Sequence, residues 1–244
     1  MIDLAGSQPR GAEALIQAGG GRLTYGGLAD RVRAAADALL LAAGGRTFVV
    51  LPLGPSVDAV TLHLACLAAG LPLCPLEPGG TSWPSVLTRY APGLVLLPEG
   101  TPGPEGHQDS GVRVARHVVW RPDRPSTHHL HPELALLLPT SGSTGSPKLV
   151  RLSSANVMAN ARSIAEILPT GPGERAITSL PLPYAYGLSV LHSHLHGGGL
   201  VVLTGHSFLR PEFWGVFGEE RCTSFAGVPY VYETLHRLRF DPAR

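Results

Sequence analysis

Charged side chains are scarce in this sequence, and acidic and basic residues nearly cancel. Asp, Glu, Lys and Arg make up 15% of the 244 residues, against about 25% in an average soluble domain. The net charge is only +1, whereas a general nucleic-acid binder has a clear excess of basic residues. No nucleic-acid partner is therefore expected. With 44% apolar residues, the chain also lacks the composition of a disordered protein.

Signals for a membrane or an oxidising compartment are missing as well. No uninterrupted apolar run reaches the roughly 18 residues of a membrane helix, so no membrane span is expected. The start, MIDLAGSQPR, lacks the basic and apolar regions of a secretion signal. The three cysteines, Cys66, Cys74 and Cys222, form no CxxC pair. These features predict a reduced, cytoplasmic protein.

Lysine is almost absent from the chain. Of the 19 basic residues, 18 are arginine and one is Lys148. Such a ratio indicates a bias toward arginine wherever either cation serves. Because the two side chains bind phosphates differently, the position that kept lysine suggests a chemical role. The count alone leaves chance survival at the surface as the alternative.

Short apolar runs alternate with longer segments of helical spacing along the chain. Strands are predicted at 23–25, 47–53, 71–76, 93–99, 117–120, 133–140, 175–182, 199–205 and 223–229. Helices are predicted at 27–45, 55–70, 153–168, 186–198, 208–220 and 230–240. This alternation predicts an α/β fold, layered, with a mostly parallel sheet flanked by helices.

Two turn-rich segments, 98–111 and 121–132, are predicted to be loops. The first of them suggests a division of the chain into an N-terminal α/β subdomain, 1–110, and a second α/β subdomain, 111–244. The second subdomain contains the segment with the strongest chemical signal.

That segment runs from Leu138 to Lys148 and reads LPTSGSTGSPK. It lies between a predicted strand and a predicted helix, where phosphate-binding turns occur in α/β sheets. Glycines let backbone N–H groups approach an anion, hydroxyls add donors, and lysine adds a mobile positive charge. A Ser/Gly-rich surface turn is the alternative. The segment is not a Walker loop, because Ser146 and Pro147 separate Gly145 from Lys148.

TSGSTGSPKLV followed by SSANV resembles the phosphate-loop signature of the adenylate-forming superfamily. LTYGGLADRVRAAADAL resembles the early strand–helix signature of that superfamily, and PLPYAYGLSVLHSHLHGGG its Pro-Leu-x-His-x-x-Gly segment. FAGVPYVYETL resembles the later Gly-Val-Pro segment. The last two are closer to acyl- or aryl-CoA ligases than to peptide-synthetase domains. The resemblance spans nearly the whole chain and implies the N-terminal part of the adenylate-forming fold.

The resemblance implies an AMP-forming ligase activity in which a carboxylic acid attacks the α-phosphate of ATP and pyrophosphate leaves. Mg²⁺ normally assists, and CoA or a carrier-protein thiol accepts the acyl group. By position, binding of the β- and γ-phosphates falls to Thr140, Ser141, Gly142, Ser143, Thr144, Gly145 and Lys148. Lys148 also inherits the catalytic role of neutralising the leaving group. By the same analogy, the acyl pocket is bordered by Tyr184, Tyr186, Gly187, Gly227, Val228 and Pro229.

Three positions depart from the family pattern. Leu149 stands where glycine is usual, which predicts different packing where the helix begins after the loop. Ser154 replaces a frequent histidine. Tyr184 stands where the Pro-Leu-x-His segment has its histidine. Tyr184 is then a gate or wall of the acyl pocket, or else a core tyrosine with its hydroxyl bonded.

Length is the largest departure, because the family's ribose-binding aspartate, hinge and small C-terminal domain have no counterpart before Arg244. The second lysine of the family, from that small domain, has no candidate here. The chain is therefore a fragment of a ligase, one subunit of a split ligase completed by a C-terminal partner, or a shortened protein that binds a nucleotide or partner without catalysis. Whether it is an enzyme by itself stays open.

Two other functional signals are weak. His192 and His196 share a helical face, but no HExxH motif, cysteine pair or acidic ligand accompanies them, so no metal site is predicted. Ser141 and Ser143 lack the GxSxG context of a hydrolase nucleophile. The identity of the acid, the thiol acceptor and the oligomeric state are left open.

Overall fold

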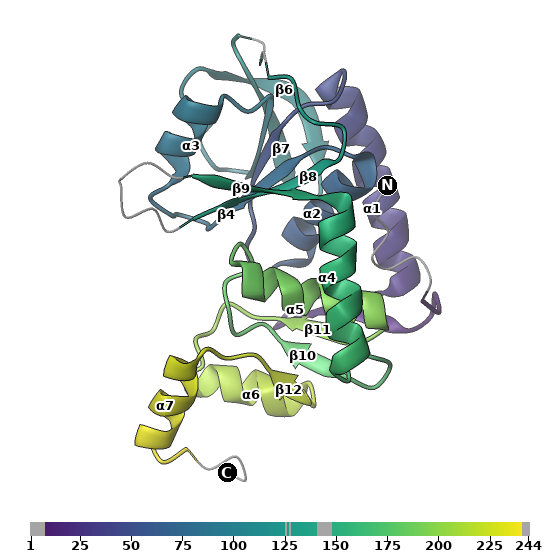
Figure 1. Cartoon of the computed structure of the whole chain (residues 1–244), viewed down its shortest axis with the longest axis vertical. Coiled ribbons are helices and arrows are strands. Elements are labelled where there is room, and N and C mark those ends of the chain that lie inside the picture. Colours follow the sequence, from purple (N-terminus) through teal and green to yellow (C-terminus); the bar gives the residue numbers. More distant parts are fainter. Residues whose placement is uncertain (1–7, 125, 127, 141–147, 241–244) are drawn as a thin grey trace.

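The computed structural model describes residues 8–124, 126, 128–140 and 148–240, and they form two stacked sheets (Figure 1). The five-stranded sheet has the order β12 (Ser224–Phe225), β10 (Arg175–Ile177), β11 (Leu200–Leu203), β1 (Glu13–Gln17) and β2 (Arg22–Thr24). The seven-stranded sheet has the order β6 (His107–Val114), β7 (His117–Pro122), β5 (Leu94–Pro98), β3 (Val49–Pro52), β4 (Leu73–Leu76), β8 (Leu134–Pro139) and β9 (Leu149–Ser153).

The predicted α/β fold is confirmed, and the interior of each sheet is parallel. Strands β12, β10, β11 and β1 run parallel in one sheet, and β5, β3, β4 and β8 in the other. Antiparallel pairing is confined to the margins, where β2, β7, β6 and β9 add to the parallel strands. The carboxyl ends of the parallel strands in each sheet therefore meet at one edge, where ligands bind in open α/β sheets.

Helices occupy three layers around the two sheets. These helices are α1 (Tyr25–Ala43), α2 (Val57–Ala69), α3 (Trp83–Tyr90), α4 (Ser154–Ile167), α5 (Ala185–Gly197), α6 (Pro211–Glu219) and α7 (Pro229–Arg237). Helix α2 contacts β3 and β4 of the larger sheet and β1 of the smaller one, so it lies between them. Helix α3 packs on the outer face of the seven-stranded sheet and α6 on the outer face of the five-stranded sheet.

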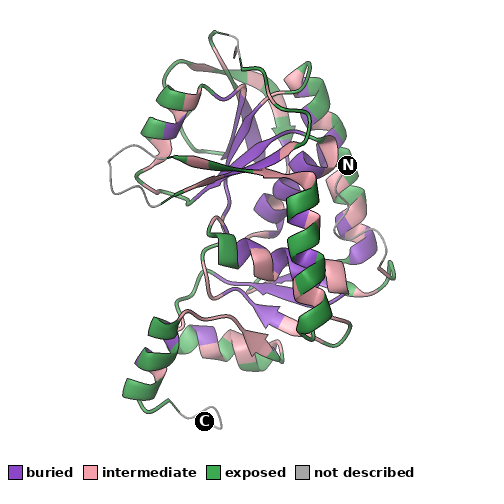
Figure 2. Ribbon diagram, viewed as in Figure 1, coloured by how far each residue is buried: buried purple, intermediate pink, exposed green. Residues whose placement is uncertain are grey.

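Side chains that point alternately to the two faces of each strand produce these layers. Leu51 of β3 points into the large core between the sheets, whereas its neighbour Val50 points toward α3. In β1, Leu15 faces the same large core and Ile16 faces α6. Successive side chains of a strand lie on opposite faces, so strands that are apolar on both faces need cover on both. Figure 2 shows the resulting buried strands, enclosed by helices with exposed outer faces.

Capping residues define the ends of the long helices. Thr24 accepts a hydrogen bond from the backbone N–H of Gly27 at the start of α1, and Ser56 accepts one from Ala59 at the start of α2. Both helices end at a left-handed glycine, Gly44 for α1, where φ is 63°, and Gly70 for α2. These side-chain caps and glycine stops satisfy backbone groups that have no partner within the helix.

The structure contains elements that the sequence pattern did not predict. Strand β1 and helix α3 were not predicted, β6 begins inside the segment expected to be a loop, and β9 lies inside the expected connection to α4. The boundary expected between residues 110 and 111 falls within β6, and both halves of the chain supply strands to both sheets. Among the described residues, no helix is long and apolar enough to cross a membrane.

Candidate functional site

The ends of the candidate phosphate loop form the base of a β-hairpin. Strands β8 and β9 pair in antiparallel fashion up to Pro139 and Leu149, and the backbone N–H of Thr140 donates to the carbonyl of Lys148 at 2.9 Å. Both Thr140 and Lys148 are exposed. The other residues of the expected phosphate site lie outside the described part of the chain: Ser141, Gly142, Ser143, Thr144 and Gly145.

The helix predicted after this loop is present as α4, but a strand that was not predicted lies between the loop and the helix. Strand β9 separates Lys148 from α4, whose N-cap is Ser153 in a capping box with Asn156. Leu149 lies in β9, half-buried against the cluster under α3, and not at a helix entry. The positive end of the α4 dipole therefore lies at the far end of β9 from Lys148. The α4 dipole is therefore not directed at an anion bound beside Lys148.

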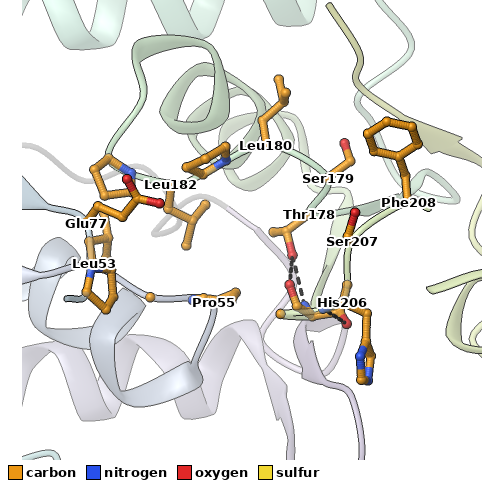
Figure 3. Close-up of a pocket in the computed structure, with 16 residues that line it drawn as sticks. Leu53, Pro55, Glu77, Thr178, Ser179, Leu180, Leu182, His206, Ser207 and Phe208 are labelled. Atoms are coloured by element: carbon orange, nitrogen blue, oxygen red, sulfur yellow. Dashed lines mark hydrogen bonds between the residues drawn. The ribbon is translucent and has the colours of Figure 1, made fainter. Parts of the chain in front are cut away.

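A cavity of about 330 Å³ lies where the carboxyl edges of the two sheets meet (Figure 3). Leu53 and Pro55 follow β3, and Glu77 follows β4, on the side of the larger sheet. Thr178 to Pro183 follow β10, and Thr204 to Phe208 follow β11, on the side of the smaller sheet. The cavity thus combines apolar walls with hydroxyls and one carboxylate, in the place expected for a ligand of an α/β sheet.

Hydrogen bonds tie the segments after three neighbouring strands to one another. The Thr178 hydroxyl donates to the carbonyl of Thr204 at 3.1 Å and accepts from its N–H at 2.9 Å. The Ser179 hydroxyl donates to the carbonyl of Ala226. The segment after β10 is therefore held on one side to the end of β11 and on the other to the segment after β12.

Tyr184, Tyr186 and Gly187 lie at the start of α5, directly after the cavity segment. Tyr184 is 52% exposed and Tyr186 is 42% exposed, so Tyr184 is not the buried core residue that was one alternative. Its role as gate or wall of an acyl pocket stays a prediction. The N–H of Tyr184 donates to the carbonyl of Pro181 at 3.0 Å, which closes the turn that leads into the helix.

Gly187 packs directly against the backbone of that turn. A Cβ atom at Gly187 would lie 2.2 Å from the carbonyl oxygen of Pro181. Replacing Gly187 with alanine is expected to lower the free energy of unfolding by roughly 1 to 3 kcal/mol, because the backbone has to shift. Thermal or urea unfolding measures this change.

Gly215 provides the matched control for that substitution. It lies inside α6, and a Cβ there has nothing within 4 Å. Gly215→Ala is expected to raise stability by roughly 0.5 to 1 kcal/mol, because alanine loses less backbone entropy in a helix. Equal changes for Gly187→Ala and Gly215→Ala would contradict the close packing of Gly187.

Gly227, Val228 and Pro229 lead from β12 into α7. Val228 is the N-cap and Pro229 the first residue of the helix, a position that suits a residue without an N–H. Gly227 lies beside Tyr232, where a Cβ would come within 2.9 Å of the ring. Through the Ser179–Ala226 bond, the structure places this segment next to the one that leads to Tyr184.

The two groups of predicted site residues come from different sheets. The hairpin that carries Lys148 follows β8 of the seven-stranded sheet, and the tyrosines and Gly227 follow strands of the five-stranded sheet. In Figure 1, the start of β9 and α7 lie on the same side of the molecule, at the left. Thr178, Ser179 and Thr204 were missed by sequence reasoning. Their one signal is a hydroxyl residue directly after, or shortly after, an apolar strand.

Within the described residues, no group of three or more histidine, cysteine, aspartate or glutamate side chains lies close enough together to hold a metal ion. His192 of α5 contacts His63 of α2, with 2.8 Å between their Nε2 atoms. His192 and His63 are both buried.

Comparison with known proteins places this chain in a family. The AMP-binding enzyme family matches residues 3–85 and 92–244. Sulfoacetate–CoA ligase of Cupriavidus necator is 30% identical in an alignment 244 positions long. The alignment covers 88% of this chain and 46% of that protein. Hybrid PKS-NRPS synthetase iliA of Neonectria sp. is 32% identical in an alignment 239 positions long. This alignment covers 91% of this chain and 6% of that protein.

A solved structure agrees with this result. ATP-bound MatB from Rhodopseudomonas palustris matches with a TM-score of 0.74 and 25% identity, over 96% of this chain and 49% of that one. The chain belongs to the AMP-binding enzymes, which confirms the resemblance to the adenylate-forming superfamily. It spans about half the length of the CoA ligase and of MatB.

Proposed function

We propose that this chain contributes the nucleotide- and acid-binding part of an enzyme that activates a carboxylic acid as an acyl-adenylate. ATP is the co-substrate, pyrophosphate leaves, and CoA or a carrier-protein thiol accepts the acyl group. The observation that carries the proposal is the segment from Thr140 to Lys148, with its glycines, hydroxyls and single lysine, at the carboxyl end of β8. It lies within the part of the chain that matches the AMP-binding enzymes, and MatB in its solved structure holds ATP.

In this proposal the loop and Lys148 hold the β- and γ-phosphates, and the acid binds near Tyr184, Tyr186, Gly187 and the segment 227–229. The carboxylate then attacks the α-phosphate, and the bond to pyrophosphate breaks. Lys148 stabilises the charge that develops on the leaving group, since a cation acts most strongly where negative charge accumulates.

Mg²⁺ would enter this site with ATP. In the part of the chain that the structure describes, no cluster of three carboxylate, histidine or cysteine side chains is present. The β- and γ-phosphates would supply ligands of the ion, with hydroxyl groups near Thr140 as further candidates. When bound, Mg²⁺ would neutralise charge on pyrophosphate.

The name of a related ligase favours a short acid. The related CoA ligase of Cupriavidus necator is named for sulfoacetate, which is itself a short acid.

Acid-dependent exchange of radioactive pyrophosphate into ATP tests the proposal. The protein should be isolated from the cells that make it, together with any polypeptide that co-purifies, and its intact mass compared with 25.6 kDa. We expect exchange with short acids, such as acetate or propionate, to exceed exchange with octanoate or benzoate. ATP binding without exchange for any acid would contradict acid activation and favour a nucleotide-binding protein without catalysis.

A further inference from the structure

A second, larger cavity lies on the outer face of the seven-stranded sheet. Its volume is about 690 Å³, twice that of the cavity in Figure 3. Helix α3 forms one wall, and the segment from Pro98, the last residue of β5, to Glu105 forms the other. Figure 1 shows α3 on the outside of this sheet, away from the five-stranded sheet. The volume lies within the range of small-molecule sites in proteins, about 300 to 1,000 Å³.

This cavity is separate from the proposed acid site. Tyr184, Gly187 and Gly227 follow strands of the other sheet and do not line it. One wall also departs from the family: the match to the AMP-binding enzymes omits residues 86–91, and Leu87 and Thr88 of that stretch line the cavity. The shape of the cavity is therefore set in part by residues outside the shared family pattern.

The lining is apolar and includes one aromatic ring that is held in place. The indole N–H of Trp83 donates to the carbonyl of Glu77 at 3.0 Å, which fixes the ring at the start of α3. Leu97 is buried at the end of β5, and Leu87 is half-buried on α3. Proline rings form much of the remaining wall. Such a surface suits a flat apolar ring, which gains from contact with indole and with aliphatic carbons.

Charge at the rim selects among ring compounds. Among the described residues, Glu105 is the one charged side chain that lines the cavity, and it is exposed. In the same part of the chain, no arginine, lysine or histidine lines the cavity to balance it. A carboxylate without a cation beside it attracts a protonated amine and repels an acid or a phosphate. The lining is thus unsuited to ATP and to the proposed acid substrate.

We propose that this cavity binds a small molecule with one aromatic ring and a protonated amine. The ring lies against Trp83, Leu87 and Leu97, and the amine lies at the rim beside Glu105. The proposal does not depend on acid activation, because none of these residues takes part in it.

Phenethylamine and phenylacetate are suitable probes, since they share a ring and a short chain and differ in the sign of the charge. Binding to the full chain can be measured by titration calorimetry and by NMR of isotope-labelled protein. We expect phenethylamine to bind at least tenfold more tightly than phenylacetate, with shifts in the Trp83 indole signal. Glu105→Gln should remove most of this preference. Glu99→Gln is the matched control, since Glu99 lies on the same segment outside the cavity lining, and it should leave the preference unchanged.

Filling the cavity tests where the probe binds. Leu87→Trp is expected to abolish binding of both probes, and Thr88→Trp, from an exposed position on the same wall, is the second variant if Leu87→Trp does not fold. Binding that survives in the folded variant would overturn the location. Equal affinity for the two probes would overturn the role of Glu105. Absence of phenethylamine binding at millimolar concentration would overturn the site as a whole.

Discussion

Replacing Lys148 with alanine is expected to lower ATP-dependent activity by about 10²- to 10³-fold. Lys148 is the only lysine of the chain, and it is exposed at the base of the hairpin whose strands end at Pro139 and Leu149. At 4 Å, a single positive charge stabilises a phosphate charge by roughly 4 kcal/mol when the effective dielectric constant is about 20. Because pyrophosphate gains charge as it leaves, the loss should fall mainly on the rate of adenylate formation.

Arg151→Ala is the matched control. Arg151 lies on β9, is exposed, and belongs to the same hairpin as Lys148. Pyrophosphate exchange should be nearly unchanged in Arg151→Ala. In Lys148→Arg it should be restored only in part, because a guanidinium has a different shape and hydration from an ammonium. Unchanged kinetics in Lys148→Ala would refute the assignment of the loop.

The sequence predicted the long helices well because their signals are local. Helix α1 begins after Thr24 and ends at Gly44, and α2 begins after Ser56 and ends at Gly70. Each of these residues acts on backbone groups within one helical turn, so neighbouring letters contain the information. The alternation of these helices with apolar strands was enough to predict an α/β fold.

Elements that depend on distant partners were missed. Strand β9 has five residues and exposes Val150 and Arg151, so nothing in it separates a strand from a helix entry. It forms because β8 offers a free edge. Strand β6 contains Gly111 with φ of 78°, and its pairing with β7 is irregular between Asp109 and Arg113. In the sequence, this glycine favours a turn. In the structure it marks a bulge within a strand.

In the candidate site, too, features that depend on neighbouring residues could be predicted and features that depend on distant partners could not. The segment from Thr140 to Lys148 could be predicted because its residues are consecutive. The bonds that shape the cavity could not, since Thr178 meets Thr204 and Ser179 meets Ala226 only through the order of the strands. The parallel pairing of β10 with β11 and β12 is what brings these hydroxyls and carbonyls together.

A buried pair of histidines joins the two helices that follow β3 and β10. His63 of α2 and His192 of α5 lie with their Nε2 atoms 2.8 Å apart and their rings stacked, with centroids 5.0 Å apart. One imidazole has to donate through its Nε2 and the other has to accept, so the two rings cannot both be protonated. Within the described residues, the Nδ1 atom of His63 has no hydrogen-bond partner. A positive charge at this position would be buried without compensation.

Acid is therefore expected to destabilise the protein through this pair. Burial lowers the pKa of His192 from 6.5 to about 4, and burial together with the nearby His192 lowers the pKa of His63. In the unfolded chain both residues take up protons as the pH falls below about 6.5, whereas the folded protein does not. The contribution of the pair to the free energy of unfolding is thus fully present above pH 6.5 and decreases as the pH falls to about 4. The contribution of His192 alone is roughly 3 kcal/mol.

Urea unfolding at several pH values measures this effect, and substitution of the pair identifies its source. The double variant His63→Leu/His192→Leu should lose much less stability between pH 6.5 and pH 4 than the parent, because two buried bases are gone. Burial also lowers the pKa of His117 and of His194, so a smaller slope should remain. His236→Leu removes an exposed histidine of α7 and should keep the parent slope. An identical slope in the double variant would show that the acid sensitivity arises elsewhere.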